Sequence, residues 1–181
     1  MRRISTFLVT AALASAMSAG AAAQAPRGES DHGTAMKSAS ADTTFAQKAA
    51  MGGKKEVTEG KFAAAKAANA DVKAFANRLV KDHSAANLEL MKLMKGKRVA
   101  ASPEPKAEPQ AWRSQSGAAF DRAFIEHAVE DHEQDIALFE AEAKDGSDPA
   151  LKEWAAKQLP TLREHLKAAQ DLKSKLQSTT R

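Results

Sequence analysis

The sequence of 181 residues contains no cysteine and no tyrosine, and aromatic residues make up only 5% of it. Without cysteine, the chain cannot form disulfides, cysteine-ligated zinc sites, iron–sulfur clusters or thiol nucleophiles. A cysteine-free chain also suits an oxidising compartment, where a free thiol would be a liability. The sequence lacks a glycine-rich phosphate loop and the G-x-S-x-G motif of serine hydrolases. We therefore assign no catalytic residue, and the sequence favours a non-enzymatic protein.

Charge of one sign is not concentrated in any part of the chain. Twenty-seven Lys and Arg residues stand against 23 Asp and Glu residues, which gives a net charge of +4. Nucleic-acid-binding proteins gather basic residues on one face or along one helix. The basic runs at residues 54–55 and 95–98 are too short to form such a stripe. No nucleic-acid partner is expected, and the sequence does not indicate which protein, if any, is a partner.

A long uncharged stretch lies at the N-terminus. Arg2 and Arg3 precede an apolar segment over residues 4–17, and three alanines at 21–23 provide a small-residue cleavage site. This order is typical of a secretory signal peptide, so we expect residues 1–23 to be removed and the protein to be exported. The alternative is an uncleaved membrane anchor, because residues 4–23 are long enough to span a bilayer. The second half of the stretch is mostly Ala, Ser and Gly, which favours cleavage and predicts no stable membrane insertion afterwards.

Residues 24–41 contain Gly, Ser, Ala and charged residues without an apolar period, which predicts a disordered linker. From Asp42 onward the composition is helical, and we expect helices over residues 43–68, 70–95, 117–144 and 149–177. Asp42 is the expected N-cap of the first helix. Asp148 followed by Pro149 is typical of a helix start. Pro160 lies inside the last helix and is expected to kink it.

Apolar residues recur at alternating spacings of three and four along the helices, which predicts packing at shallow left-handed angles. Residues 97–116 contain three prolines, which exclude a continuous helix there. Fully extended, this crossover reaches roughly 66–70 Å, whereas each helix is about 40 Å long. The crossover can therefore return along the whole molecule. We predict an all-α, ferritin-like four-helix bundle over residues 42–178, built from two helical hairpins, with its second and third helices parallel.

Each predicted helix carries one titratable residue in the middle of its apolar stripe. These residues are Glu56, His83, His132 and His165. Glu56 and His83 both lie about 20 Å from the turn between their helices, and the other two also lie near mid-height. Imidazoles and carboxylates that face a bundle core are typical ligands of transition metals. We therefore predict that these four residues bind Zn, Fe, Cu or Mn in the core.

Further side chains near the four ligands are expected to orient them through hydrogen bonds. These supporting candidates are Glu59, Asp82, His127 and Asp131. The alternative hypothesis is a buried network of His–Glu hydrogen bonds that fixes the helix register and binds no metal. In that case the protein is a structural or interaction bundle.

A series of short motifs follows in order along residues 42–176. They are Asp42-x-x-Phe45, Glu56-x-x-Glu59-Gly60-Lys61-x-Ala63, Val72-Lys73-x-Phe75-Ala76, Asp82-His83, Gly117-x-x-Phe120-Asp121, Asp131-His132, Leu159-Pro160 and His165-Leu166. The series resembles an exported bacterial family known as domain of unknown function 4142, which is considered ferritin-like. The resemblance implies a four-helix bundle behind a signal peptide, in a periplasmic or outer-membrane-associated protein. It implies no known reaction.

The sequence departs from ferritin-like di-iron proteins in one respect. Those proteins carry a Glu-x-x-His pair on each of two helices. Here Val80 stands three residues before His83, and Leu162 stands three residues before His165. Neither side chain can bind a metal, so a di-iron centre that activates oxygen is not predicted.

Overall fold

The computed structural model describes residues 31–97 and 111–178. The predicted signal peptide, residues 1–23, and most of the predicted crossover lie outside the described residues. The described part of the chain forms five helices and no strands. They are α1 (Asp31–Lys66), α2 (Ala70–Met94), α3 (Ala111–Ser114), α4 (Gly117–Asp145) and α5 (Pro149–Ser178). The prediction of an all-α bundle is confirmed.

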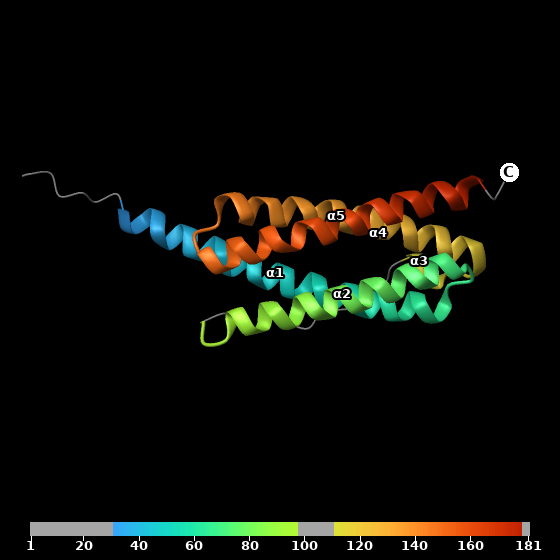
Figure 1. Ribbon diagram of the computed structural model, residues 1–181, viewed down its shortest axis with the longest axis horizontal. Helices are drawn as coiled ribbons and strands as arrows, with labels where there is room; N and C mark the ends of the chain where they lie inside the picture. Colours follow the sequence, from blue (N-terminus) through green and yellow to red (C-terminus); the bar gives the residue numbers. More distant parts are fainter. Residues whose placement is uncertain (1–30, 98–110, 179–181) are drawn as a thin grey trace, which may run out of the picture.

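The four long helices pack side by side as two hairpins (Figure 1). α1 packs against α2, and α4 packs against α5. Smaller contacts between α2 and α5, and between α1 and α4, join the hairpins into one bundle. Figure 1 shows α2 and α4 running in the same direction, from the right of the view to the left. The parallel direction of these two helices agrees with the prediction.

Local capping explains where two of the helices begin. The side-chain oxygen of Asn69 accepts hydrogen bonds from the backbone N–H groups of Asp71 (2.8 Å) and Val72 (3.2 Å), which caps α2. Asp148 does the same at the start of α5, where its carboxylate accepts from the backbone N–H groups of Ala150 and Leu151. The predicted start of the last helix is confirmed. α5 continues as a helix through Pro160.

The start of the first helix differs from the prediction. α1 begins at Asp31, inside the segment that composition had suggested was a linker, so a helix start at Thr43 is wrong. Asp42 lies within α1 and does not cap it. Its buried carboxylate instead accepts hydrogen bonds from Ser147 N (3.0 Å), Ser147 Oγ (2.6 Å) and Asp148 N (2.8 Å). An aspartate can accept hydrogen bonds from the first turn of its own helix or from the turn that precedes a neighbouring helix. The local sequence does not distinguish these two roles.

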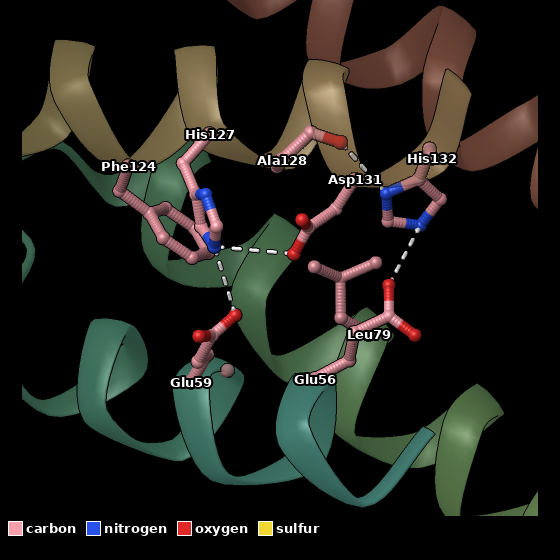
Figure 2. Close-up of a pocket in the computed structure, with 9 residues that line it drawn as sticks. Glu56, Glu59, Leu79, Phe124, His127, Ala128, Asp131 and His132 are labelled. Atoms are coloured by element: carbon pink, nitrogen blue, oxygen red, sulfur yellow. Dashed lines mark hydrogen bonds and ion pairs between the residues drawn. The ribbon is translucent and has the colours of Figure 1, made fainter. Parts of the chain in front are cut away.

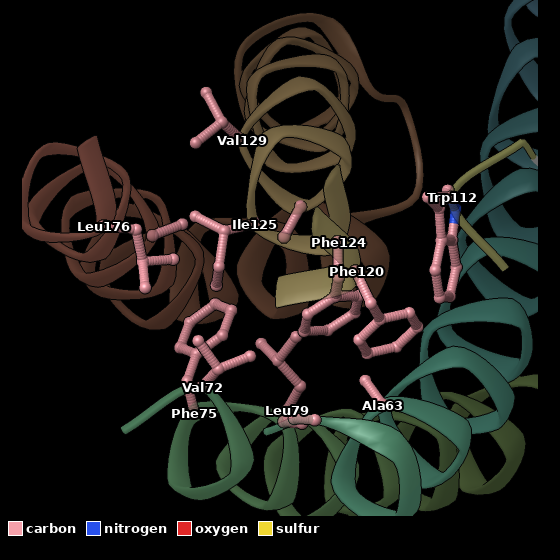
Figure 3. Packing of buried hydrophobic residues seen from close by; sticks show 14 residues of the cluster. Ala63, Val72, Phe75, Leu79, Trp112, Phe120, Phe124, Ile125, Val129 and Leu176 are labelled. Carbon is pink, nitrogen blue, oxygen red and sulfur yellow. The ribbon is translucent and has the colours of Figure 1, made fainter. Parts of the chain in front are cut away.

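The apolar core has two parts, separated along the bundle. One part lies toward the turn between α1 and α2 and includes Phe75, Phe120 and Phe124 (Figure 3). The other lies toward the turn between α4 and α5 and includes Phe45 and Trp154. The four predicted metal ligands fall between the two parts in all four helices. A polar layer therefore divides the core at mid-height.

The short helix α3 lies in the second half of the predicted crossover. Its Trp112 is buried, and its ring lies 5.7 Å from the ring of Phe120 and 5.4 Å from that of Phe124. This packing fixes the end of the crossover to the bundle. Among the described helices, none is both long and apolar enough to cross a membrane.

Candidate metal centre

The four predicted ligands come together in the bundle core, one from each long helix. Glu56, His83, His132 and His165 belong to α1, α2, α4 and α5 in turn, and all four are buried. His83 and His132 lie at similar distances from the starts of α2 and α4. Because these two helices are parallel, the two histidines lie at one level of the bundle. His132 and His165 are 1% and 0% exposed, so no bulk water competes for their nitrogens.

The distances within the centre are those of groups in contact. Glu56 Oε2 lies 3.0 Å from His83 Nδ1, and Glu56 Oε1 lies 3.7 Å from His132 Nε2. His132 Nε2 lies 3.3 Å from His165 Nδ1. One ring nitrogen from each of the three histidines lies within 4.8 Å of one from each of the others. Figure 2 shows the Glu56 carboxylate facing His132 across the space between α1 and α4.

Hydrogen bonds fix the tautomers of two of the imidazoles. His132 Nδ1 lies 2.8 Å from the carbonyl oxygen of Ala128, and a carbonyl only accepts, so Nδ1 carries the proton. His165 Nε2 lies 2.9 Å from the carboxylate of Asp82, so Nε2 carries the proton in that ring. The nitrogens left without a proton are His132 Nε2 and His165 Nδ1. These are the two atoms that face each other.

Two nitrogen lone pairs at 3.3 Å repel each other unless a cation lies beside them. A proton on one ring is one solution, but burial lowers the pKa of both histidines, that of His165 to about 4. A metal ion is the other solution. Ligands at 2.0–2.1 Å from a tetrahedral ion are about 3.3–3.4 Å apart, which agrees with the observed separation of the two nitrogens.

The remaining two groups also have unsatisfied atoms. Within the described part of the chain, neither His83 Nε2 nor Glu56 Oε1 has a hydrogen-bond partner, although both atoms are buried. A buried polar atom without a partner costs about 1–3 kcal/mol, so such atoms indicate an interaction that the polypeptide alone does not supply. Burial lowers the pKa of His83 and raises that of Glu56 to about 7. Neutral imidazole is the form that binds metals.

Asp135 on α4 belongs to this acidic environment and was missed from the sequence. Burial, and then the charge of Glu56, raise its pKa to about 8. Asp135 lies three residues after His132, and residues at this spacing share one helix face. The spacing from His132 could therefore have indicated Asp135, but an aspartate outside the apolar stripe is normally expected to face solvent.

Of the four supporting residues that the sequence suggested, Asp82 contacts a ligand directly. Burial opposes its ionisation, but hydrogen bonds with His165 and Arg78 outweigh that effect and lower its pKa. An ionised carboxylate on the far nitrogen of a metal-binding histidine is a common arrangement, since it fixes the tautomer and raises the basicity of the ring.

The other three supporting residues, Glu59, His127 and Asp131, form a separate outer cluster between α1 and α4 (Figure 2). His127 Nε2 lies 3.0 Å from Glu59 and 3.1 Å from Asp131. Burial opposes protonation of His127, but the two carboxylates outweigh it and raise its pKa to about 9. His127 therefore carries a charge at neutral pH and is a poor metal ligand.

The outer cluster also contains two basic side chains that the sequence did not single out. Lys55 Nζ lies 2.6 Å from Asp131, and Arg113 lies 3.5 Å from Glu59. These cations take the places that a metal ion would need. The cluster is separate because Glu59 stands nearly one turn from Glu56, and Asp131 points about 100° away from its neighbour His132 around the helix. We interpret it as an ion-pair cluster that joins α1 to α4.

The chain matches a protein-family model. A family model described as "Domain of unknown function (DUF4142)" matches residues 27–172. Neither the curated proteins nor the solved structures include a significant match.

Proposed function

The chain belongs to this family of helical domains, and on that premise we propose that it is an exported protein that binds one divalent transition-metal ion in its core. The ligands are the three histidines and Glu56. Asp82 and the carbonyl group of Ala128 orient two of the rings. Export is inferred from the pattern of residues 1–23, and the absence of cysteine agrees with it.

One observation carries the metal proposal. Two buried imidazole nitrogens face each other at 3.3 Å, and each ring's other nitrogen lies against an oxygen acceptor, which leaves both facing nitrogens without a proton when the rings are neutral. A network of hydrogen bonds alone leaves this contact without a proton. A metal ion satisfies both nitrogens, and it also gives a role to the unpartnered oxygen of Glu56.

The donor set limits the kind of ion and the kind of role. Imidazole suits zinc, copper and iron, and a carboxylate also suits manganese. The cavity on the α2–α5 side that contacts the histidines has a volume of about 20 Å³, which is room for about one water molecule and too small for an organic substrate beside the imidazoles. These features favour a protein that stores or buffers the metal over an enzyme that acts on a larger molecule.

Elemental analysis tests the proposal directly. The mature protein is purified without a histidine tag and analysed for zinc, iron, copper and manganese. We expect one metal ion per chain, and we expect the His83→Ala and His132→Ala variants both to lose it. His127→Ala is the matched control, because that histidine belongs to the outer cluster, and it should retain the metal.

The alternative is a metal-free structural bundle, in which the same side chains only fix the helix register. It is favoured by the contacts of Glu56 with His83 and of Asp82 with His165, which need no ion. A metal-free preparation whose melting temperature does not respond to any of the four metals supports this alternative. A ligand that binds the native state must stabilise it, by about 2.7 kcal/mol at a hundredfold excess over its Kd.

A further inference from the structure

A groove on the surface of the bundle lies between α2 and α5, beside the histidines. Its volume is about 230 Å³. The groove is lined by Asp82, Ala85, Ala86, Glu89, Gln158 and Thr161, together with the basic residues Arg78 and Lys157. The groove is wide enough for a hydrated cation.

Behind the groove is the cavity of about 20 Å³ that contacts His83 and His165. Four residues line both spaces, namely Asp82, Ala86, Gln158 and Thr161. The two spaces therefore adjoin at this position, where these four side chains lie between the groove and the imidazoles. The inner cavity has room for about one water molecule or one ion without its hydration shell.

The opposite face of the centre offers a less favourable approach. The cavity there, between α1 and α4, has a volume of about 10 Å³ and is lined by Glu56, His132 and the outer cluster. Lys55, Arg113 and the protonated His127 all belong to that side. These side chains are ion-paired with Glu59 and Asp131, and they leave less open space on that face than the α2–α5 groove offers.

The groove carries acidic groups at both ends of the path. Glu89 lies at its outer part and Asp82 at its junction with the inner cavity. Their basic partners, Lys157 and Arg78, also line the groove, and both side chains are exposed to solvent. Exposed ion pairs are worth about 0–1 kcal/mol, so these two side chains can move into water when a cation arrives.

We infer that the α2–α5 groove is the route by which a divalent metal ion reaches and leaves the histidines, with Ala86 and Thr161 forming the passage. This inference rests on the proposed metal site. The ion first meets Glu89 and Asp82, then loses water molecules as it enters the inner cavity, and finally binds the imidazole nitrogens.

The test is the rate of metal exchange in variants of the passage. Zn²⁺ is loaded into the full mature protein, and its transfer to a chromophoric chelator is followed over time. We expect Ala86→Leu to slow both uptake and release roughly tenfold or more, because the ion must then wait for an opening motion. The Kd should stay nearly unchanged, since both rates change together. Ala85→Leu is the matched control, because Ala85 lines the wide groove and not the inner cavity.

A second variant that widens the groove keeps the test valid if the larger side chain of Ala86→Leu disturbs folding. The amide of Gln158 donates a hydrogen bond to Glu89 at 3.1 Å and so lies across the groove. We expect Gln158→Ala to accelerate exchange in both directions. Exchange rates equal to the wild type in Ala86→Leu and Gln158→Ala, with metal bound in all three proteins, overturn the route alone. A wild-type protein that binds no Zn²⁺ overturns the metal site, and the route falls with it.

Discussion

At the scale of single residues, the centre depends on which atom of each histidine carries the proton. The Ala128 carbonyl and the Asp82 carboxylate each hold one N–H group and leave the other nitrogen of that ring free to bind. The residues that prepare the site are therefore as important as the ligands. Asp82 is the one among them whose side chain can be changed with little change in shape.

Asp82→Asn tests this preparation. Asparagine keeps the shape, but it lacks the negative charge that fixes the His165 tautomer. We expect metal affinity to fall by about 10–100-fold, measured by competition with a chelator of known affinity. Asp145→Asn, at an exposed position at the end of α4, should leave affinity unchanged. An unaltered Kd in Asp82→Asn would show that His165 needs no such partner.

The pH dependence of the metal-free protein follows from the same burial. Burial lowers the pKa of His165 to about 4, below the value near 6.5 of an exposed histidine. The unfolded chain therefore binds the proton more readily, and the contribution of His165 to stability is complete above about pH 6.5 and is lost as the pH falls toward 4. Glu56 and Asp135 have raised pKa values and act in the opposite direction.

A comparison with His165→Gln separates these contributions, because glutamine keeps an N–H donor for Asp82 and does not titrate. In the presence of a chelator, we expect the free energy of unfolding of the wild type to fall relative to that of the variant by up to about 3 kcal/mol between pH 7 and pH 4. Urea denaturation at several pH values measures the difference. Parallel pH profiles of the two proteins would contradict the lowered pKa.

At the scale of helices and turns, the close contact of α1 with α2 depends on Gly60. A Cβ atom at this position would lie 2.8 Å from Val80 Cγ2 and 3.0 Å from the carbonyl oxygen of Ala76. The carbonyl belongs to the backbone of α2, so the two helices would have to separate. Gly52 on the same helix differs, because the nearest atom to its added Cβ is Asp135 Oδ1 at an ordinary 3.7 Å.

The two glycines therefore predict opposite results. Gly60→Ala should destabilise the protein by about 1–3 kcal/mol through overpacking. Gly52→Ala should stabilise it by about 0.5–1 kcal/mol, since alanine favours a helix. Chemical denaturation measures both. Equal effects of the two substitutions would show that the helices do not pack as closely as the structure indicates.

Two buried carboxylates join the ends of one hairpin to the other. Asp42 on α1 accepts hydrogen bonds from the turn between α4 and α5. Asp121 on α4 accepts them from Ala68 N (3.0 Å) and Asn69 N (2.8 Å), in the turn between α1 and α2. Each hairpin thus holds the turn of its neighbour, and the relative height of the helices is set at both ends.

Asp121→Ala tests this role. The substitution leaves two N–H groups of the turn without their acceptor, and we expect a loss of about 2–4 kcal/mol in the free energy of unfolding. Asp71→Ala is the matched control, because Asp71 makes an exposed ion pair with Lys175 that is worth about 0–1 kcal/mol. Similar losses in the two variants would mean that the turn is satisfied in another way.

The sequence predicts the helices of this molecule better than it predicts which side chains contact each other between helices. Spacings of three and four gave the four helices and brought Glu56 and the three histidines to one level, because both follow from helix geometry alone. Asp82 and Asp131 each precede a core histidine in the sequence, but they make different contacts. Asp82 contacts His165 on another helix, whereas Asp131 contacts His127 on its own helix. Their roles depend on how each helix is rotated in the bundle. That rotation is set by tertiary packing and is not visible in a single sequence.

At the scale of the whole molecule, the fold is a bundle whose apolar core is interrupted by one polar layer. The two apolar clusters pack on either side of the layer, and Asp42 and Asp121 hold the two turns. Among the described residues, the layer brings together two buried atoms without a hydrogen-bond partner, His83 Nε2 and Glu56 Oε1, and the facing nitrogens of His132 and His165. Under the proposed function, the rest of the bundle provides a frame for the metal centre.

Anomalous diffraction from crystals of the mature protein grown with Zn²⁺ tests this proposal most directly. Data collected on both sides of the zinc absorption edge locate the ion independently of any ligand assumption. We predict one strong peak in each chain, about 2.0–2.1 Å from the nitrogens of His132 and His165, with His83 and Glu56 completing the coordination. A peak at the outer cluster of Glu59, His127 and Asp131, or peaks confined to the surface, would contradict the proposed centre.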